Sequence, residues 1–104
     1  MTIQLNADNN LKIHELFGKE LKDLLTEELS RFSEHITKLE VHLSDDNGGK
    51  DGPNDKRCML EARLEGRQPI AVTAHADTLE QSVAAAIDKL KNSLDTILGR
   101  LRNH

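Results

Sequence analysis

The sequence predicts a single α+β domain spanning residues 1–104, built from a four-stranded sheet with two helices packed on one of its faces. Two observations indicate this class. Four short segments alternate apolar and polar residues, as strands do, and two long segments repeat apolar residues every three or four positions, as helices do. The predicted order is β-α-β-β-β-α, and the one-sided alternation of the strands means that both helices cover the same face.

The first strand and the first helix follow from residue spacing. The string "TIQLNA" at 2–7 alternates apolar and polar residues and is followed by the turn-forming "DNN". From about Lys12 to His35, apolar residues recur at helical spacing, on a face that includes Phe32 and continues to Ile36. We therefore expect one continuous helix over this stretch.

Three further strands are predicted from alternating segments. "TKLEVHLS" at 37–44, "RCMLEARLEG" at 57–66 and "IAVTAHA" at 70–76 each place apolar residues on one side and polar residues on the other. This alternation directs Cys58 toward the core, where it packs as a small hydrophobic residue. The intervening stretch "DDNGGKDGPND", about 45–55, has no apolar residue and is predicted to be a flexible loop.

The last helix is the strongest pattern in the chain. Asp77 or Thr78 is expected to cap its first turn through a side-chain oxygen. Apolar residues then recur every three or four positions from Leu79 to Leu101. The sequence therefore predicts a long amphipathic helix that covers the sheet.

Composition excludes several classes of protein. With 37% hydrophobic and 31% charged residues, the chain is typical of a soluble globular domain. No apolar run approaches the roughly 20 residues needed to cross a bilayer. The N-terminal segment lacks the pattern of a secretion signal, so we expect a cytoplasmic protein that does not contact a membrane. A single cysteine excludes a disulfide within the chain.

Net charge and aromatic content limit the modes of nucleic-acid binding. A formal charge of -4 argues against a protein that coats nucleic acid indiscriminately, although it does not exclude a local basic patch. Phe17 and Phe32 are the only aromatic residues, and both fall on an expected apolar helix face. Recognition of RNA by stacking bases on sheet aromatics is therefore not expected.

Cations in the last helix fall on two separate lines. Positions eleven apart nearly coincide around a helix, so Lys89 and Arg100 share one line, whereas Lys91 and Arg102 share another. The second line has Asp88 and Asp95 close by, which partly neutralise it. The first line, here called the acid-free flank, also carries Ser82, Ala85, Asn92, Ser93, Thr96 and Asn103.

The residue types of the acid-free flank are those that hydrogen-bond phosphate oxygens. The alternative interpretation is a solvated helix face whose terminal arginines complement the helix dipole. Lys19 and Lys22 on the first helix share a broad face with Glu15 and Asp23, and an ordinary solvated surface also explains them.

No catalytic, metal-binding or cofactor-binding pattern stands out. His42 and His75 are expected on the open sheet face, but two imidazoles are too few for a zinc site, which normally has three or four ligands. The carboxylates are scattered, without the apolar surroundings that raise a pKa for acid catalysis. We therefore expect a protein that is not an enzyme and that has no metal, cofactor or small-molecule substrate.

Several strings, in this order, resemble one family over essentially the whole chain. They are "IQLNADNN", "RFSEHI", "KLEVHL", "ARLEG" with "VTAHAD", and "AAAIDKLKNSL" in the last helix. The chain resembles the ribosome hibernation-promoting factor and ribosome-associated inhibitor family, also described as sigma-54 modulation protein or S30EA-like, in its short single-domain form. This resemblance implies a fold like that of a double-stranded-RNA-binding domain.

The resemblance also implies a function and a set of contact residues. It implies a protein that binds the RNA of the small ribosomal subunit in the channel used by messenger and transfer RNA, and that silences translation in stationary phase or stress. Lys89 of "IDKL" matches a basic residue of the family's last helix, and Arg100 and Arg102 fall at its basic end. With Lys91, Lys19 and Lys22 they form the set of candidate RNA-binding residues.

A second function remains open on the sequence. The family's basic C-terminal tract is interrupted here by "DTILG", and the net charge is negative. The alternative is a protein-interaction or regulatory module that has the same fold and weak or no RNA binding. The dependence of binding on ionic strength distinguishes these two functions, because phosphate-driven association weakens steeply as the salt concentration rises.

Overall fold

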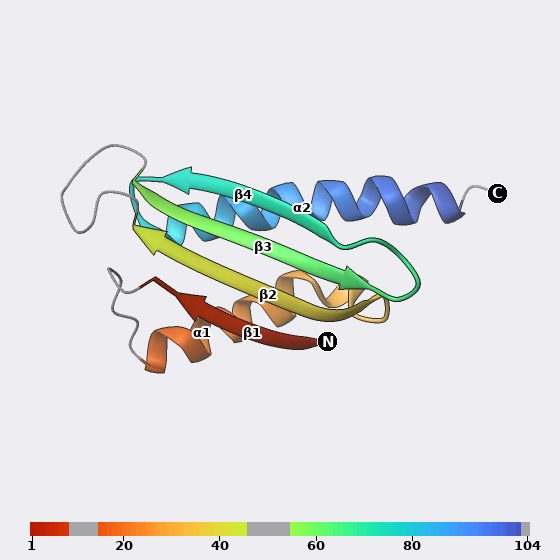
Figure 1. Cartoon of the computed structure of the whole chain (residues 1–104). Coiled ribbons are helices and arrows are strands. Elements are labelled where there is room, and N and C mark those ends of the chain that lie inside the picture. Colours follow the sequence, from red (N-terminus) through yellow and green to blue (C-terminus); the bar gives the residue numbers. More distant parts are fainter. Residues whose placement is uncertain (9–14, 46–54, 103–104) are drawn as a thin grey trace.

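Figure 1 shows the computed structural model, which describes residues 1–8, 15–45 and 55–102, with only the backbone for residues 100–102. Its elements, in chain order, are β1 (Thr2–Ala7), α1 (Glu15–Glu28), a short 3-10 helix η1 (Ser30–Phe32), β2 (Ile36–Asp45), β3 (Lys56–Leu64), β4 (Ile70–Ala76) and α2 (Leu79–Arg102). The predicted α+β class and the order β-α-β-β-β-α are confirmed.

The four strands form one mixed sheet in the order β1-β2-β3-β4. β1 pairs with β2 in parallel, with Thr2 opposite Lys38, whereas β2–β3 and β3–β4 are antiparallel. The parallel pair follows from connectivity, because α1 carries the chain back across the sheet between β1 and β2. β1 and β4 are therefore the two outer strands.

Both helices lie on one side of the sheet, as the alternation of the strands predicts (Figure 1). α1 lies next to β1: a Cβ added at Gly18 would come within 3.4 Å of Leu5 Cδ2. The core residues that are less than 2% exposed come from both layers and are Leu25, Leu29, Leu39, Val41, Leu43, Cys58, Leu60, Ala62, Val83, Ala86, Leu90 and Leu94. The inward orientation predicted for Cys58 is confirmed.

The expectation of one helix from about 12 to 35 is wrong at its C-terminal end. α1 ends at Glu28, and the chain continues as η1 through i to i+3 hydrogen bonds, including Phe32 N to Leu29 O at 2.9 Å. This tighter turn still buries Phe32, so the apolar spacing looks helical. Ile36 belongs to β2, where it pairs with Leu64. Positions 12–14 lie outside the described residues.

The predicted boundaries of β1 and β4 are confirmed, whereas those of β2 and β3 differ by one or two residues. β2 begins one residue early and ends one residue late, and β3 ends at Leu64 rather than at 66. Of the predicted loop at about 45–55, positions 46–54 lie outside the described residues, and Asp45 is the last residue of β2. Lys56 Nζ lies 3.1 Å from Asp45 Oδ2 and 3.2 Å from Asp55 Oδ2. These ion pairs link the residue that precedes positions 46–54 to the residues that follow them.

The residue that caps α2 is Thr78. Its Oγ1 accepts a hydrogen bond from the backbone N–H of Gln81 at 3.1 Å, which satisfies one of the free donors of the first helical turn. We expect Thr78→Ala to lower the free energy of unfolding by about 1 kcal/mol, measured by urea denaturation. Thr78→Ser keeps the oxygen and serves as the control. Equal stability of the alanine variant and the wild type would contradict this role.

Among residues 1–8, 15–45 and 55–102, no helix is both long enough and apolar enough to cross a membrane.

Candidate functional site

α2 presents two flanks of different character to either side of its buried face. One is the acid-free flank, on which Lys89, Asn92 and Thr96 are exposed and Ser93 is partly exposed. The sequence predicted Ser82 on this flank, but the structure makes it unavailable to a ligand. Its side chain is fully buried, and its hydroxyl donates a hydrogen bond to Leu79 O at 2.7 Å. The usable acid-free flank thus begins near Lys89 rather than in the first turn of the helix.

Lys89 lies where α2 meets the outer edge of the sheet. Its Nζ donates a hydrogen bond to the backbone carbonyl of Thr73 in β4 at 2.7 Å, and the side chain is exposed. Lysine has three N–H donors, so two stay available to a phosphate while the third holds the ammonium in place. Within the described part of the chain, Lys89 has no ion-pair partner.

Lys91 is on the opposite flank and is engaged by α1. Its Nζ lies 2.7 Å from Glu28 Oε2, whereas Arg31 Nη2 lies 2.8 Å from Asp95 Oδ1. Arg31 also lies over the Phe32 ring, 4.5 Å from its centroid. Sequence spacing indicated Asp88 and Asp95 as the groups that neutralise Lys91, but the carboxylate that pairs with it comes from α1. Such an ion pair competes directly with binding of an external phosphate.

The two terminal arginines are placed by their backbone alone. Arg100 lies in the last turns of α2 and Arg102 is its last residue. Their side chains lie outside the described residues, so their membership of the candidate interface stays a prediction.

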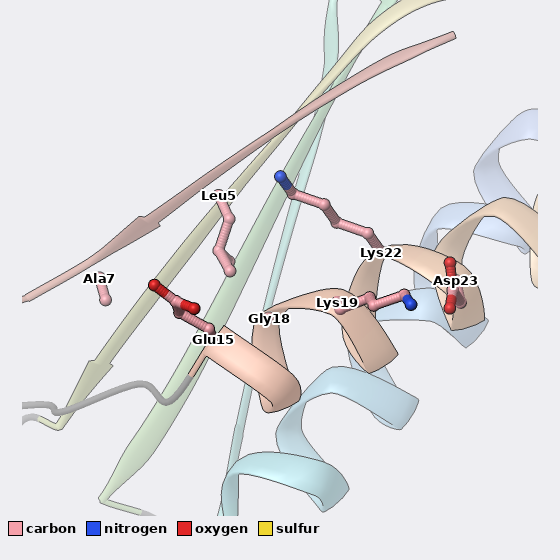
Figure 2. A pocket seen from close by; sticks show the side chains of 7 residues that line it. All are labelled: Leu5, Ala7, Glu15, Gly18, Lys19, Lys22 and Asp23. Atoms are coloured by element: carbon pink, nitrogen blue, oxygen red, sulfur yellow. The ribbon is translucent and has the colours of Figure 1, made fainter.

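Lys19 and Lys22 lie at the other edge of the sheet. Both are exposed on α1 and line a hollow of about 570 Å³ beside β1, together with Glu15 and Asp23. Figure 2 shows Lys22 extending toward β1, whereas Lys19 extends along the helix. Because Lys89 contacts β4 and these lysines border β1, the structure does not bring the three into one patch.

Arg67 is a cation that sequence reasoning missed. It is exposed in the β3–β4 turn, where Gly66 adopts φ 71°, and it lines a hollow of about 380 Å³ with Leu64, Gln68 and Ile97 of α2. The turn therefore delivers a positive charge beside the C-terminal half of α2. Arg67 and Ile97 are distant in the sequence and become neighbours only because α2 packs under the turn. No local sequence motif could therefore have predicted this contact.

The open face of the sheet is less suited to polyanions around Lys38 and Arg63, because both of these cations lie beside carboxylates. Lys38 Nζ lies 3.3 Å from Glu40 Oε1, and Arg63 lies 3.9 Å from Glu40 and 3.8 Å from Glu61. Hydrogen bonding to Glu61 and to Lys38 holds the pKa of the Glu40 carboxyl below its ordinary value. This negative charge offsets the neighbouring lysine and arginine.

The histidines expected on this face do not meet. His42 in β2 is opposite Met59, and His75 in β4 is opposite Arg57, so β3 separates them. Across residues 1–8, 15–45 and 55–102, no group of three or more histidine, cysteine, aspartate or glutamate side chains is placed to hold a metal ion.

Comparison with known proteins relates this arrangement to one family. The family model described as sigma 54 modulation protein / S30EA ribosomal protein matches residues 16–102. Among curated protein sequences, none matches the chain.

Two solved structures have a similar fold. A ribosomal subunit interface protein from Coxiella burnetii is 18% identical with a TM-score of 0.74, over 95% of this chain and 99% of that one. The N-terminal domain of Protein Y from Thermus thermophilus is 20% identical with a TM-score of 0.72, over 93% of this chain and 99% of that one. Since the family model spans both helices and the last three strands, the chain belongs to the sigma 54 modulation protein / S30EA ribosomal protein family.

Proposed function

We propose that this protein is a ribosome-associated translation inhibitor that acts in the cytoplasm during stress or stationary phase. It binds RNA of the small ribosomal subunit in the channel of messenger and transfer RNA, and it acts by occupying that channel, without catalysis or a cofactor. Membership of the S30EA ribosomal protein family supports a ribosomal partner. The observation that carries the proposal is the acid-free flank of α2, where Lys89 is exposed, is held in place and has no paired carboxylate among the described residues.

The acid-free flank explains how a protein with a net charge of -4 binds a polyanion such as RNA in this proposal. Phosphate contacts act over short range, because charges separated by more than about 8 Å are screened at physiological ionic strength. Asn92 and Thr96 add hydrogen-bonding groups to the same surface without adding negative charge. Arg67 and Arg100 extend this surface along α2 in the proposal, whereas Lys91, Lys19, Lys22 and Arg102 are secondary contacts.

The test is the salt dependence of binding to purified small subunits. We expect Lys89→Gln with Arg100→Gln to weaken cosedimentation about tenfold or more and to reduce the slope of log K against log salt by about two, one for each lost phosphate contact. The matched control is Lys38→Gln with Arg63→Gln, which removes the same charge from the open sheet face. If both pairs of substitutions have equal effects, the acid-free flank is not the binding surface. Circular dichroism verifies that all variants are folded.

A second candidate is a protein-interaction module with weak RNA binding. It is favoured by the net charge of -4 and by the ion pairs that engage Lys91 and Arg31. Association through an apolar protein contact changes little with ionic strength. A ribosome contact that survives moderate salt and both glutamine substitutions would therefore favour this second function.

A further inference from the structure

An apolar groove lies between α1 and the first turns of α2, on the side of the helices away from the acid-free flank. This helix groove, a hollow of about 170 Å³, is lined by Phe17, Glu20, Leu21, Leu24, Glu80 and Val83. Leu24 is 41% exposed, and Leu16, two turns earlier on α1, is 68% exposed. Leu24 lines the same hollow as the partly buried Phe17, so the apolar surface left in water here belongs to a patch and not to one isolated residue.

Negative charges border the helix groove. Glu20 of α1 and Glu80 of α2 are exposed, and neither has an ion-pair partner among the described residues. Farther along the same two helices, the carboxylates of Glu28 and Asp95 are bound to cations at 2.7 and 2.8 Å. The helix groove thus combines apolar side chains with carboxylates that are open to an external cation.

The charge and size of the helix groove exclude most kinds of occupant. A polyanion such as RNA, or an anionic membrane, is repelled by Glu20 and Glu80. A second copy placed groove to groove would bring the same carboxylates together, which is equally unfavourable. The hollow is also smaller than the roughly 300–1,000 Å³ of typical small-molecule sites. A basic polypeptide fits both the charge and the apolar surface.

We propose that the helix groove binds a basic segment of another protein, which inserts an apolar side chain between Phe17 and Leu24 and places lysine or arginine against Glu20 and Glu80. Apolar contact gives the interaction its affinity, and the two carboxylates select a cationic segment. The helix groove and Lys89 lie on opposite flanks of α2, so a basic protein and RNA are able to bind together. The proposal does not depend on RNA binding.

The experiment titrates the whole chain, labelled with ¹⁵N, with a synthetic helical peptide made of leucine and lysine. We expect amide shifts to change at Leu24 and Val83 and to stay unchanged around Thr96. A peptide in which serine replaces every leucine is expected to cause no such change, because it cannot fill the groove. Perturbation by both peptides alike, or of Thr96 alone, would overturn the proposal.

Substitutions separate a specific groove from general attraction. We expect Glu20→Gln with Glu80→Gln to weaken peptide binding about tenfold, whereas Glu34→Gln with Glu65→Gln, which removes two exposed carboxylates elsewhere, leaves it unchanged. Equal weakening by the two pairs would contradict the proposal. Sedimentation of the protein alone provides a second check, because a dimer dissociated by Leu24→Ser would mean that the occupant is another copy of this chain.

Discussion

Leu60→Ala is expected to lower the free energy of unfolding by about 3 kcal/mol, within the range of about 2–5 kcal/mol that is typical of buried leucines. Leu60 lies in the middle of β3, an inner strand of the sheet, and is 0% exposed. It is opposite Val41 on one side and Val72 on the other. Truncation removes apolar contacts and leaves a cavity that these paired strands cannot close without breaking their register.

The matched control is the same substitution at the surface. Leu16→Ala removes the same atoms from a side chain that is 68% exposed, so we expect a change of less than about 0.5 kcal/mol. Both values come from urea denaturation followed by circular dichroism. If the two substitutions proved equally destabilising, the assignment of the sheet's inner face to the core would be wrong.

The second large effect is a loss of stability at alkaline pH caused by Cys58. Burial among apolar residues raises the pKa of the Cys58 thiol from 9.0 to about 12. The folded state therefore retains a proton that the unfolded chain releases. Stability from this group is fully present below pH 9 and is lost as pH rises toward 12, by about 1.4 kcal/mol for each pH unit.

The measurement compares urea unfolding of the wild type and of Cys58→Ala between pH 8 and pH 10. We expect the wild type to lose about 1.4 kcal/mol over this interval relative to the variant, which has no thiol to ionise. The upper limit of pH 10 avoids a second contribution, because Asp45 and Asp55 raise the pKa of Lys56 above its ordinary value of 10.5. Parallel pH profiles of the two proteins would refute a buried, protonated thiol.

Alternation and helical spacing predicted most of the fold, because a two-layer domain gives each element one buried side. The strands pair as their alternation requires, with Leu39 opposite Ala62 and Cys58 opposite Ala74, all on the buried face. The end of α1 could not be predicted, because η1 keeps Phe32 buried with a spacing that resembles continued α-helix. Only the pairing of Ile36 with Leu64 identifies the start of β2.

The positions of the candidate residues around the axis of α2 could be predicted from the sequence, but their contacts could not. Helical geometry placed Lys89 and Lys91 on different flanks, and the structure agrees. The groups that bind them, Thr73 O and Glu28, are distant in sequence and are brought close only by packing of α2 against β4 and α1. The helix groove was missed for the same reason, because its apolar residues were counted as core.

The parallel pairing of β1 with β2 has a consequence for the kinetics of folding. β2, β3 and β4 are consecutive and antiparallel, so their pairing closes short stretches of chain, whereas β1 reaches β2 only after all of α1 has been traversed. Closing long stretches costs more chain entropy and slows the formation of distant contacts. We therefore expect the three-stranded meander with α2 to form first and the N-terminal strand to dock last, along β2.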